Sequence, residues 1–176
     1  LQETADLETA LSLLLFGDGA TAALVTAEPS GIALDDFRAA ILPDSEDLIT
    51  WTIGDEGFLM HLSGQVPNRI AAALRQDAAA ARPDGLLRGG RASDIAHWAV
   101  HGGGRTVLDA VEIGLALPPA ALRPSRAVLH DYGNMSSATI MFVLAGMLAE
   151  GAAGAGLAMA FGPGMVAETF RFRIAA

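Results

Sequence analysis

The chain has 176 residues, of which 52% are hydrophobic and 18% are charged, and its formal net charge is −9. This composition predicts a folded domain with a buried core and argues against intrinsic disorder. The negative charge and the lack of a Lys/Arg cluster argue against binding to nucleic acid or to an anionic membrane. The chain contains no cysteine, which excludes disulfides, thiolate metal sites and a cysteine nucleophile within it.

The sequence also allows a prediction of the cellular compartment of the protein. No run of about 18 apolar residues is present, so we expect no transmembrane helix. The first residues lack the positive charge that begins a secretory signal peptide. The chain starts with Leu1 rather than Met, which suggests that it begins within a longer polypeptide. We therefore expect a cytoplasmic protein.

The first part of the chain is expected to hold the end of a helix, a turn and a buried strand. The helix would end within residues 7–15, and the Gly-Asp-Gly of residues 16–20 is typical of a tight turn. Residues 22–26 form an apolar run that predicts a buried strand. Residues 27–47 are rich in Pro, Asp, Glu and Ser, which indicates an exposed connection.

A hairpin and a helix are expected next. Residues 48–53 alternate in polarity and predict a strand, and residues 58–62 predict a returning strand after the turn at residues 54–57. Residues 66–81 are rich in Ala and have Pro in the first turn, which predicts a helix.

The second half of the chain alternates strands and helices. A short apolar strand is expected at residues 95–100, and helices are expected at residues 106–117 and 134–149. Two strands, at residues 157–161 and 165–174, end the chain as an antiparallel pair. This order predicts an α/β protein in which helices pack against a mixed sheet.

Two polar residues occupy places where a ligand could approach the backbone. His101 ends a predicted strand and precedes Gly102-Gly103-Gly104, and Asn134 stands where a turn meets an apolar helix. A neutral imidazole and a carboxamide can each donate one N–H to the same oxygen. Such a pair would stabilise a carbonyl as it becomes an oxyanion or enolate. Taken alone, the spacing of Asn134 favours a helix N-cap over a catalytic role.

Five sequence strings occur in an order and at spacings that match a known family. They lie at residues 15–20 (Leu-Phe-Gly-Asp-Gly-Ala), 101–103 (His-Gly-Gly), 108–112 (Leu-Asp-Ala-Val-Glu), 132–138 (Tyr-Gly-Asn-Met-Ser-Ser-Ala) and 161–169 (Phe-Gly-Pro-Gly, then Glu-Thr). Together they resemble the type III polyketide synthases, which are chalcone-synthase-like enzymes of the thiolase superfamily. The resemblance runs from about Leu7 to Arg173.

The resemblance implies a thiolase-like fold, with αβαβα layers in the complete enzyme. Residues 1–26 would be the end of the N-terminal thiolase half, residues 27–48 a connection, and residues 49–176 the C-terminal half. The implied partners are the missing N-terminal half and, because such enzymes are homodimers, a second copy of the complete enzyme.

The resemblance also implies a Cys-His-Asn triad in which His101 and Asn134 are catalytic and the Cys lies outside this chain. The Cys would take an acyl group from an acyl-CoA starter, and malonyl-CoA would lose CO₂ on the His and Asn donors. The resulting enolate would attack the acyl group in a decarboxylative Claisen condensation. The coenzyme A thioesters are substrates, and no metal or other cofactor is implied.

The resemblance also implies that other residues line the acyl cavity or contact coenzyme A. Phe16 resembles a gatekeeper between tunnel and cavity, and Met60 stands where plant relatives carry a second gatekeeper Phe. A flexible Met there suggests a cavity shaped for aliphatic or longer starters. The remaining cavity residues would be Ser136, Gly162, Pro163 and Gly164, and those near the pantetheine arm would be Leu62, Gly103, Gly104 and Thr106.

Other readings stay open. A ketoacyl-acyl-carrier-protein synthase III shares the fold and triad, but Met135-Ser136-Ser137 and Pro163 favour the polyketide synthase. An esterase with a His-Gly-Gly-Gly loop would need a downstream Gly-x-Ser-x-Gly elbow, which the sequence lacks. The missing Cys also fits an inactive half that only binds coenzyme A or a partner, or a two-chain enzyme.

Overall fold

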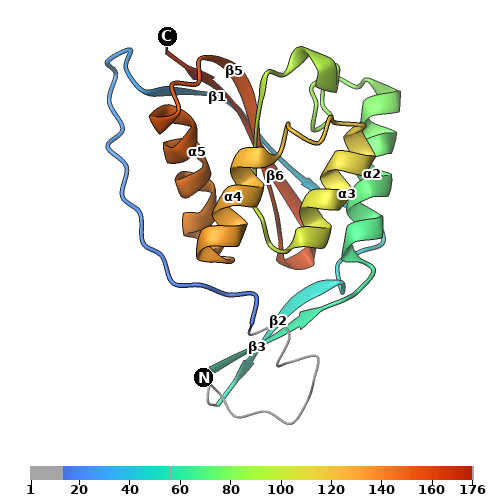
Figure 1. Ribbon diagram of the computed structural model, residues 1–176. Coiled ribbons are helices and arrows are strands. Elements are labelled where there is room, and N and C mark those ends of the chain that lie inside the picture. The colour runs from blue at the N-terminus through green and yellow to red at the C-terminus, as the bar shows by residue number, and fades with distance from the viewer. Residues whose placement is uncertain (1–13, 56, 176) are drawn as a thin grey trace.

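A four-stranded mixed sheet is the centre of the fold (Figure 1). The computed structural model describes residues 14–55 and 57–175. The strand order is β1-β6-β5-β4, in which β4 is parallel to β5 and the other neighbours are antiparallel. The strands are β1 (Ile32–Ile41), β4 (His97–Val100), β5 (Gly154–Gly162) and β6 (Val166–Ile174). The predicted mixed α/β architecture is confirmed.

Helices cover both faces of this sheet, because successive side chains of a strand point to opposite faces. Trp98 and Val100 of β4 pack in one core cluster with the helices α2 and α3, whereas Ala99 packs in a second cluster with α5. The helix α4 lies along the free edge of β4, where the N–H of Val100 donates to Ser125 Oγ at 2.9 Å. The helices are α2 (Val66–Ala80), α3 (Arg105–Leu115), α4 (Arg123–Tyr132) and α5 (Thr139–Ala149).

Apolar spacing explains the two helices that the sequence predicted well. Val66, Ile70 and Leu74 recur four residues apart and are buried along one side of α2. In α3 the buried stripe includes Leu108 and Leu115. In the described part of the chain, no helix is both long and apolar enough to cross a membrane.

The predicted hairpin forms a separate two-stranded sheet that projects from the body (Figure 1). It consists of β2 (Ile49–Gly54) and β3 (Gly57–Leu62). Ser63 N–H donates to Leu48 O at 2.9 Å and closes the base of the hairpin.

The prediction of a buried strand at residues 22–26 was wrong. These residues are extended but exposed, and the side chains of Leu24 and Val25 are 90% and 82% exposed. An apolar run becomes a buried strand only where another strand pairs with it, and no strand pairs with it among the described residues. The segment runs along the outside of α5 (Figure 1). An open groove of about 1630 Å³ is lined by residues of this segment and of α5. The predicted helix end at residues 7–15 falls almost wholly outside the described residues.

The prediction of an exposed connection over residues 27–47 was also wrong in part, because β1 lies inside it. This strand is hard to recognise in the sequence, because the consecutive carboxylates Asp35 and Asp36 interrupt its apolar pattern. Asp36 has a φ of 40° at a β-bulge, where the pairing with β6 shifts register. Arginines neutralise both carboxylates: Arg173 Nε lies 3.0 Å from Asp35 Oδ2, and Arg88 Nε lies 2.9 Å from Asp36 Oδ2.

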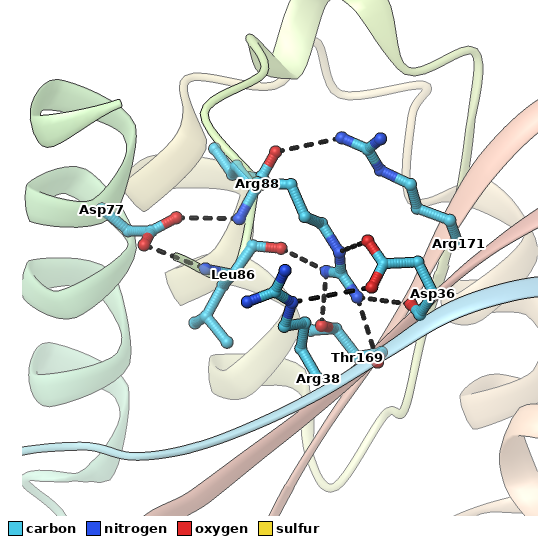
Figure 2. Close-up of polar contacts among 8 residues, drawn as sticks. Asp36, Arg38, Asp77, Leu86, Arg88, Thr169 and Arg171 are labelled. Carbon is cyan, nitrogen blue, oxygen red and sulfur yellow. Dashed lines mark hydrogen bonds and ion pairs between the residues drawn. The ribbon is translucent and has the colours of Figure 1, made fainter. Parts of the chain in front are cut away.

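Arg88 fastens the loop between α2 and β4 to the sheet (Figure 2). Its side chain is only 4% exposed. Besides the carboxylate of Asp36, it donates to the carbonyl of that residue at 2.6 Å, to Thr169 Oγ1 at 2.7 Å and to the carbonyl of Leu86. Asp77 of α2 accepts two backbone N–H bonds from the same loop at 3.0 and 2.9 Å. The loop is thereby tied to α2, β1 and β6 at once.

Two predictions around α4 and α5 need correction. The helix predicted over residues 134–149 begins at Thr139, after a short 3₁₀ turn at Ser136–Ala138. Asn134 is therefore not the N-cap of a long helix. The helix α4 was not predicted, because its sequence is mostly polar and it buries only Ser125 and Val128.

Candidate active site

His101 stands at the carboxyl end of β4 and continues its pairing with β5. Its N–H donates to Met159 O at 2.8 Å, one residue beyond the last strand pair. Because side chains alternate along a strand, His101 points to the same face as Ala99, which is the face covered by α5. The carboxyl ends of parallel strands are where α/β proteins place their sites.

The imidazole of His101 is partly buried. Its Nδ1 is buried and, in the described part of the protein, has no hydrogen-bond partner. Burial lowers the pKa of His101 from its ordinary value, so the ring is neutral at pH 7. The Nε2 atom lies beside the glycine loop: a Cβ placed on Gly103 would be 3.7 Å from it. In the tautomer with the proton on Nε2, the ring presents an N–H donor beside Gly103.

Asn134 is fixed by bonds of both its backbone and its side chain. Its backbone N–H donates to Leu15 O at 2.8 Å, and its carbonyl accepts from Gly17 N–H at 2.9 Å. Its side-chain Oδ1 accepts from Ser136 N–H at 2.8 Å, and its Nδ2 donates to Gly103 O at 3.3 Å. Asn134 as a whole is 8% exposed, and one of the two Nδ2 hydrogens remains for a ligand.

Gly103 is the point at which the two predicted donors meet. The Nδ2 of Asn134 donates to its carbonyl, and the Nε2 of His101 lies 3.7 Å from where a Cβ on Gly103 would be. The structure therefore brings together two side chains that are separated by a helix pair in the sequence. Both can offer one N–H each, which is the arrangement that stabilises a carbonyl oxygen as it gains negative charge.

Phe16 and Ser136 lie directly beside this pair. Phe16 forms a bridge with Asn134, and its side chain is 38% exposed. The backbone of Gly17 lies close to that of Tyr132, because a Cβ on Gly17 would collide with the carbonyl oxygen of Tyr132. Ser136 has a φ of 55°, a left-handed conformation that its bond to Asn134 helps to hold.

The remaining predicted residues fall into two groups. Gly162 ends β5 at the same end of the sheet as His101, and Pro163 and Gly164 follow it in a 3₁₀ turn next to the hairpin strand β2. Gly103 and Gly104 precede α3, and Thr106 is exposed in its first turn.

Met60 and Leu62 lie on β3, on the projecting hairpin, and Met60 is half-buried. No hydrogen bond in the described part of the chain joins these two residues to His101 or Asn134. The groups that fix His101 and Asn134 are backbone groups: the carbonyls of Leu15, Gly103 and Met159 and the N–H groups of Gly17 and Ser136. These backbone groups could not be predicted from the sequence, because the residue type does not indicate which backbone groups form such bonds.

Comparison with known proteins supports the resemblance seen in the sequence. Residues 34–175 match the model of the family described as chalcone and stilbene synthases, C-terminal domain. The chain belongs to the chalcone and stilbene synthase family. The matched range includes both His101 and Asn134, and the predicted resemblance to type III polyketide synthases is confirmed. The match begins inside the predicted connection of residues 27–48, while the predicted domain limits themselves remain a prediction.

A solved structure supports the fold of this chalcone and stilbene synthase chain. It is similar to the crystal structure of PKS-I from the brown alga Ectocarpus siliculosus, with 34% sequence identity and a TM-score of 0.70. The match covers 85% of this chain and 41% of the algal protein, so the chain spans less than half the length of that relative. The predicted thiolase-like fold class is confirmed.

Proposed function

We propose that this chain supplies the His and Asn of a type III polyketide synthase that condenses an acyl-CoA starter with malonyl-CoA. The observation that carries the proposal is the meeting of two N–H donors, from His101 and Asn134, at Gly103. Burial keeps the imidazole neutral, and the carboxamide is fixed by Ser136 and Gly103. Preorganised donors in a site that excludes water are worth more than the same groups in solution.

In the proposed reaction the thioester carbonyl of malonyl-CoA accepts hydrogen bonds from His101 Nε2 and Asn134 Nδ2. The bond to the carboxylate carbon breaks, CO₂ leaves, and its electron pair forms the enolate, whose oxygen stays on the two donors. The α-carbon of the enolate then attacks the carbonyl of an acyl group held on a Cys thioester. The new C–C bond forms and the Cys leaves as a thiolate.

The nucleophilic Cys must come from outside this chain, which contains none. We propose that a preceding thiolase half supplies it and that the complete enzyme is a cytoplasmic homodimer that needs no metal or further cofactor. Phe16, Met60, Ser136 and the residues 162–164 would line the acyl cavity. The residues proposed to contact coenzyme A are Leu62, Gly103, Gly104 and Thr106.

The test uses Asn134→Asp in the complete enzyme. Aspartate keeps an oxygen that can accept from Ser136 N–H, but it removes the N–H donor. We expect the rate of malonyl-CoA decarboxylation to fall by roughly 10²–10³-fold, as for loss of one oxyanion donor. The exposed neighbour variant Asp131→Asn is the control and should decarboxylate at the wild-type rate. Equal rates in Asn134→Asp and wild type would refute the donor role.

The lack of a Cys favours a second candidate, a half that binds coenzyme A thioesters without catalysing condensation. Intact masses of the native and denatured protein distinguish the two. A larger species, or a companion polypeptide with a Cys, supports the condensing enzyme. A native protein made of this 18.1 kDa chain alone supports the binding role.

A further inference from the structure

A buried threonine lies beside the turn that carries Asn134. Thr139 is the first residue of α5 and is fully buried. Its Oγ1 accepts a hydrogen bond from the N–H of Met135 at 2.9 Å. A hydroxyl is costly to bury unless it is hydrogen-bonded, so this bond explains how the side chain is tolerated there. Thr139 directly follows the motif at residues 132–138, and the reaction proposed above gives it no role.

The direction of this bond is not that of a helix cap. A side chain that caps the start of a helix accepts from N–H groups two or three residues after it. Thr139 instead accepts from a residue that precedes it by four and lies outside α5. The N-cap position of α5 is held by Ala138, which has no polar side chain. The hydroxyl therefore closes the turn between Asn134 and the helix.

Through this bond, Thr139 holds one end of a single peptide group. The N–H of Met135 and the carbonyl of Asn134 belong to the same planar group. That carbonyl accepts from Gly17 N–H at 2.9 Å, so both polar ends of the group are bonded. The peptide group before Asn134 is held as well, since its N–H donates to Leu15 O at 2.8 Å. Fixing the planes on both sides of a Cα fixes the direction of its Cα–Cβ bond.

The direction of the Cα–Cβ bond decides where the carboxamide of Asn134 presents its free N–H. Within the side chain, Oδ1 accepts from Ser136 N–H at 2.8 Å, whereas the bond from Nδ2 to Gly103 O is 3.3 Å long. The second bond exceeds the usual range for N–H donors, so it restrains the amide weakly. The backbone on the Thr139 side must supply the rest of the restraint.

We propose that Thr139 is a positioning residue for Asn134, whose hydroxyl holds the following peptide group so that the free Nδ2 hydrogen meets the substrate carbonyl oxygen. The proposal rests on the condensing function proposed above. Thr139 is fully buried and acts through Asn134. Without Oγ1, the N–H of Met135 would be left unpaired in a buried residue, and the turn would shift to reach another acceptor.

The test compares Thr139→Val and Thr139→Ser in the complete enzyme by the rate of malonyl-CoA decarboxylation. Valine keeps the shape of threonine but removes the acceptor. A misplaced oxyanion donor costs less than a lost one, so we expect kcat of Thr139→Val to fall by at least about tenfold. The KM for malonyl-CoA should stay within about twofold, because the donor acts mainly in the transition state. Thr139→Ser keeps Oγ1 and should retain most of the wild-type kcat.

Two controls separate positioning from a general loss of structure. Thr169→Val removes another buried threonine hydroxyl, which accepts from Arg88, and should lower stability without lowering kcat. The second control adds Thr139→Val to Asn134→Asp. There it should change kcat by less than about twofold, because the donor that Thr139 positions is already gone.

Four results would overturn the positioning role. These are a wild-type kcat in Thr139→Val, a Thr139→Ser variant as slow as Thr139→Val, an equal fall of kcat in Thr169→Val, and the same fold loss from Thr139→Val with and without Asn134→Asp. A wild-type rate in Asn134→Asp alone is a different result. It would refute the donor role in the proposed function, and with it any need for a positioning residue.

Discussion

The partly buried imidazole of His101 links the proposed chemistry to the stability of the fold. Burial lowers its pKa, so the folded chain resists a proton that the unfolded chain accepts at about pH 6.5. The unfolded state then binds more protons, and the free energy of unfolding falls as the pH is lowered below about 6.5. We expect His101→Gln to remove this pH dependence, because glutamine does not titrate.

Urea unfolding of both proteins at a series of pH values from about 7 down to about 5 measures this effect. His130→Gln is the control, since the His130 side chain is 87% exposed. Bonds from Arg88 and Arg82 hold the pKa values of Asp36 and Asp84 below their usual range, so the stability that those ion pairs provide is lost only near or below about pH 4. Parallel curves for wild type and His101→Gln would contradict the prediction.

At the scale of single residues, the sequence predicted the two candidate donors but not the backbone groups that hold them in place. His101 and Asn134 were predicted from their motifs, and the structure brings both to Gly103. Spacing alone favoured a helix N-cap role for Asn134, and the structure shows that its Oδ1 accepts from Ser136 N–H ahead of a 3₁₀ turn. Periodicity could not show this, because a short turn and the first turn of a helix have the same residue types.

Among the secondary-structure elements, the contact of α2 with α3 depends on Gly114. A Cβ at this position would lie 2.9 Å from Ala71 O and 3.1 Å from Leu74 Cβ, and the backbone of α2 cannot yield easily. We expect Gly114→Ala to lower the free energy of unfolding of this chain by about 1–3 kcal/mol. Gly146→Ala is the opposite case, because a Cβ there has open space within α5.

Since Ala favours a helix over Gly, Gly146→Ala should raise the free energy of unfolding by roughly 1 kcal/mol. Thermal unfolding followed by circular dichroism compares the two variants with wild type. Changes of the same sign in both would contradict the packing argument, because both substitutions add the same methyl group to a helix.

Elements with a strong apolar period were predictable, and those without one were not. The helices α2 and α3 and the hairpin were confirmed with bounds that differ by a few residues. The strand β1 was missed because Asp35 and Asp36 interrupt its apolar pattern, and their partners Arg173 and Arg88 are far away in the sequence. The run at residues 22–26 has the pattern of a strand without a paired neighbour. The local sequence pattern reveals neither the ion pairs that join β1 to distant residues nor whether another strand pairs with residues 22–26.

At the scale of the whole molecule, Arg88 joins parts of the chain that local sequence keeps apart (Figure 2). It bonds β1 through Asp36, β6 through Thr169 and its own loop through Leu86. We expect Arg88→Ala to lower the free energy of unfolding by about 3 kcal/mol, because it leaves buried acceptors without a donor. Arg88→Lys should recover only part of this, since an ammonium cannot form the forked contacts.

Chemical denaturation of this chain measures both effects. Arg82→Ala is the control: Arg82 also pairs with an aspartate, Asp84, but both side chains are more than 60% exposed, and the change should have little effect. An equal loss of stability in Arg88→Ala and Arg82→Ala would show that the buried network adds nothing beyond a surface ion pair.

The bulge in β1 limits the addition of another strand to this edge of the sheet. β1 is an edge strand, and an open edge can template fibril growth when a strand from another molecule adds to it. Here the backbone turns at Asp36, and Asp35, Asp36 and Arg38 place charges along the edge. An added strand could not keep its register past that point. Amyloid-like growth from β1 is therefore disfavoured.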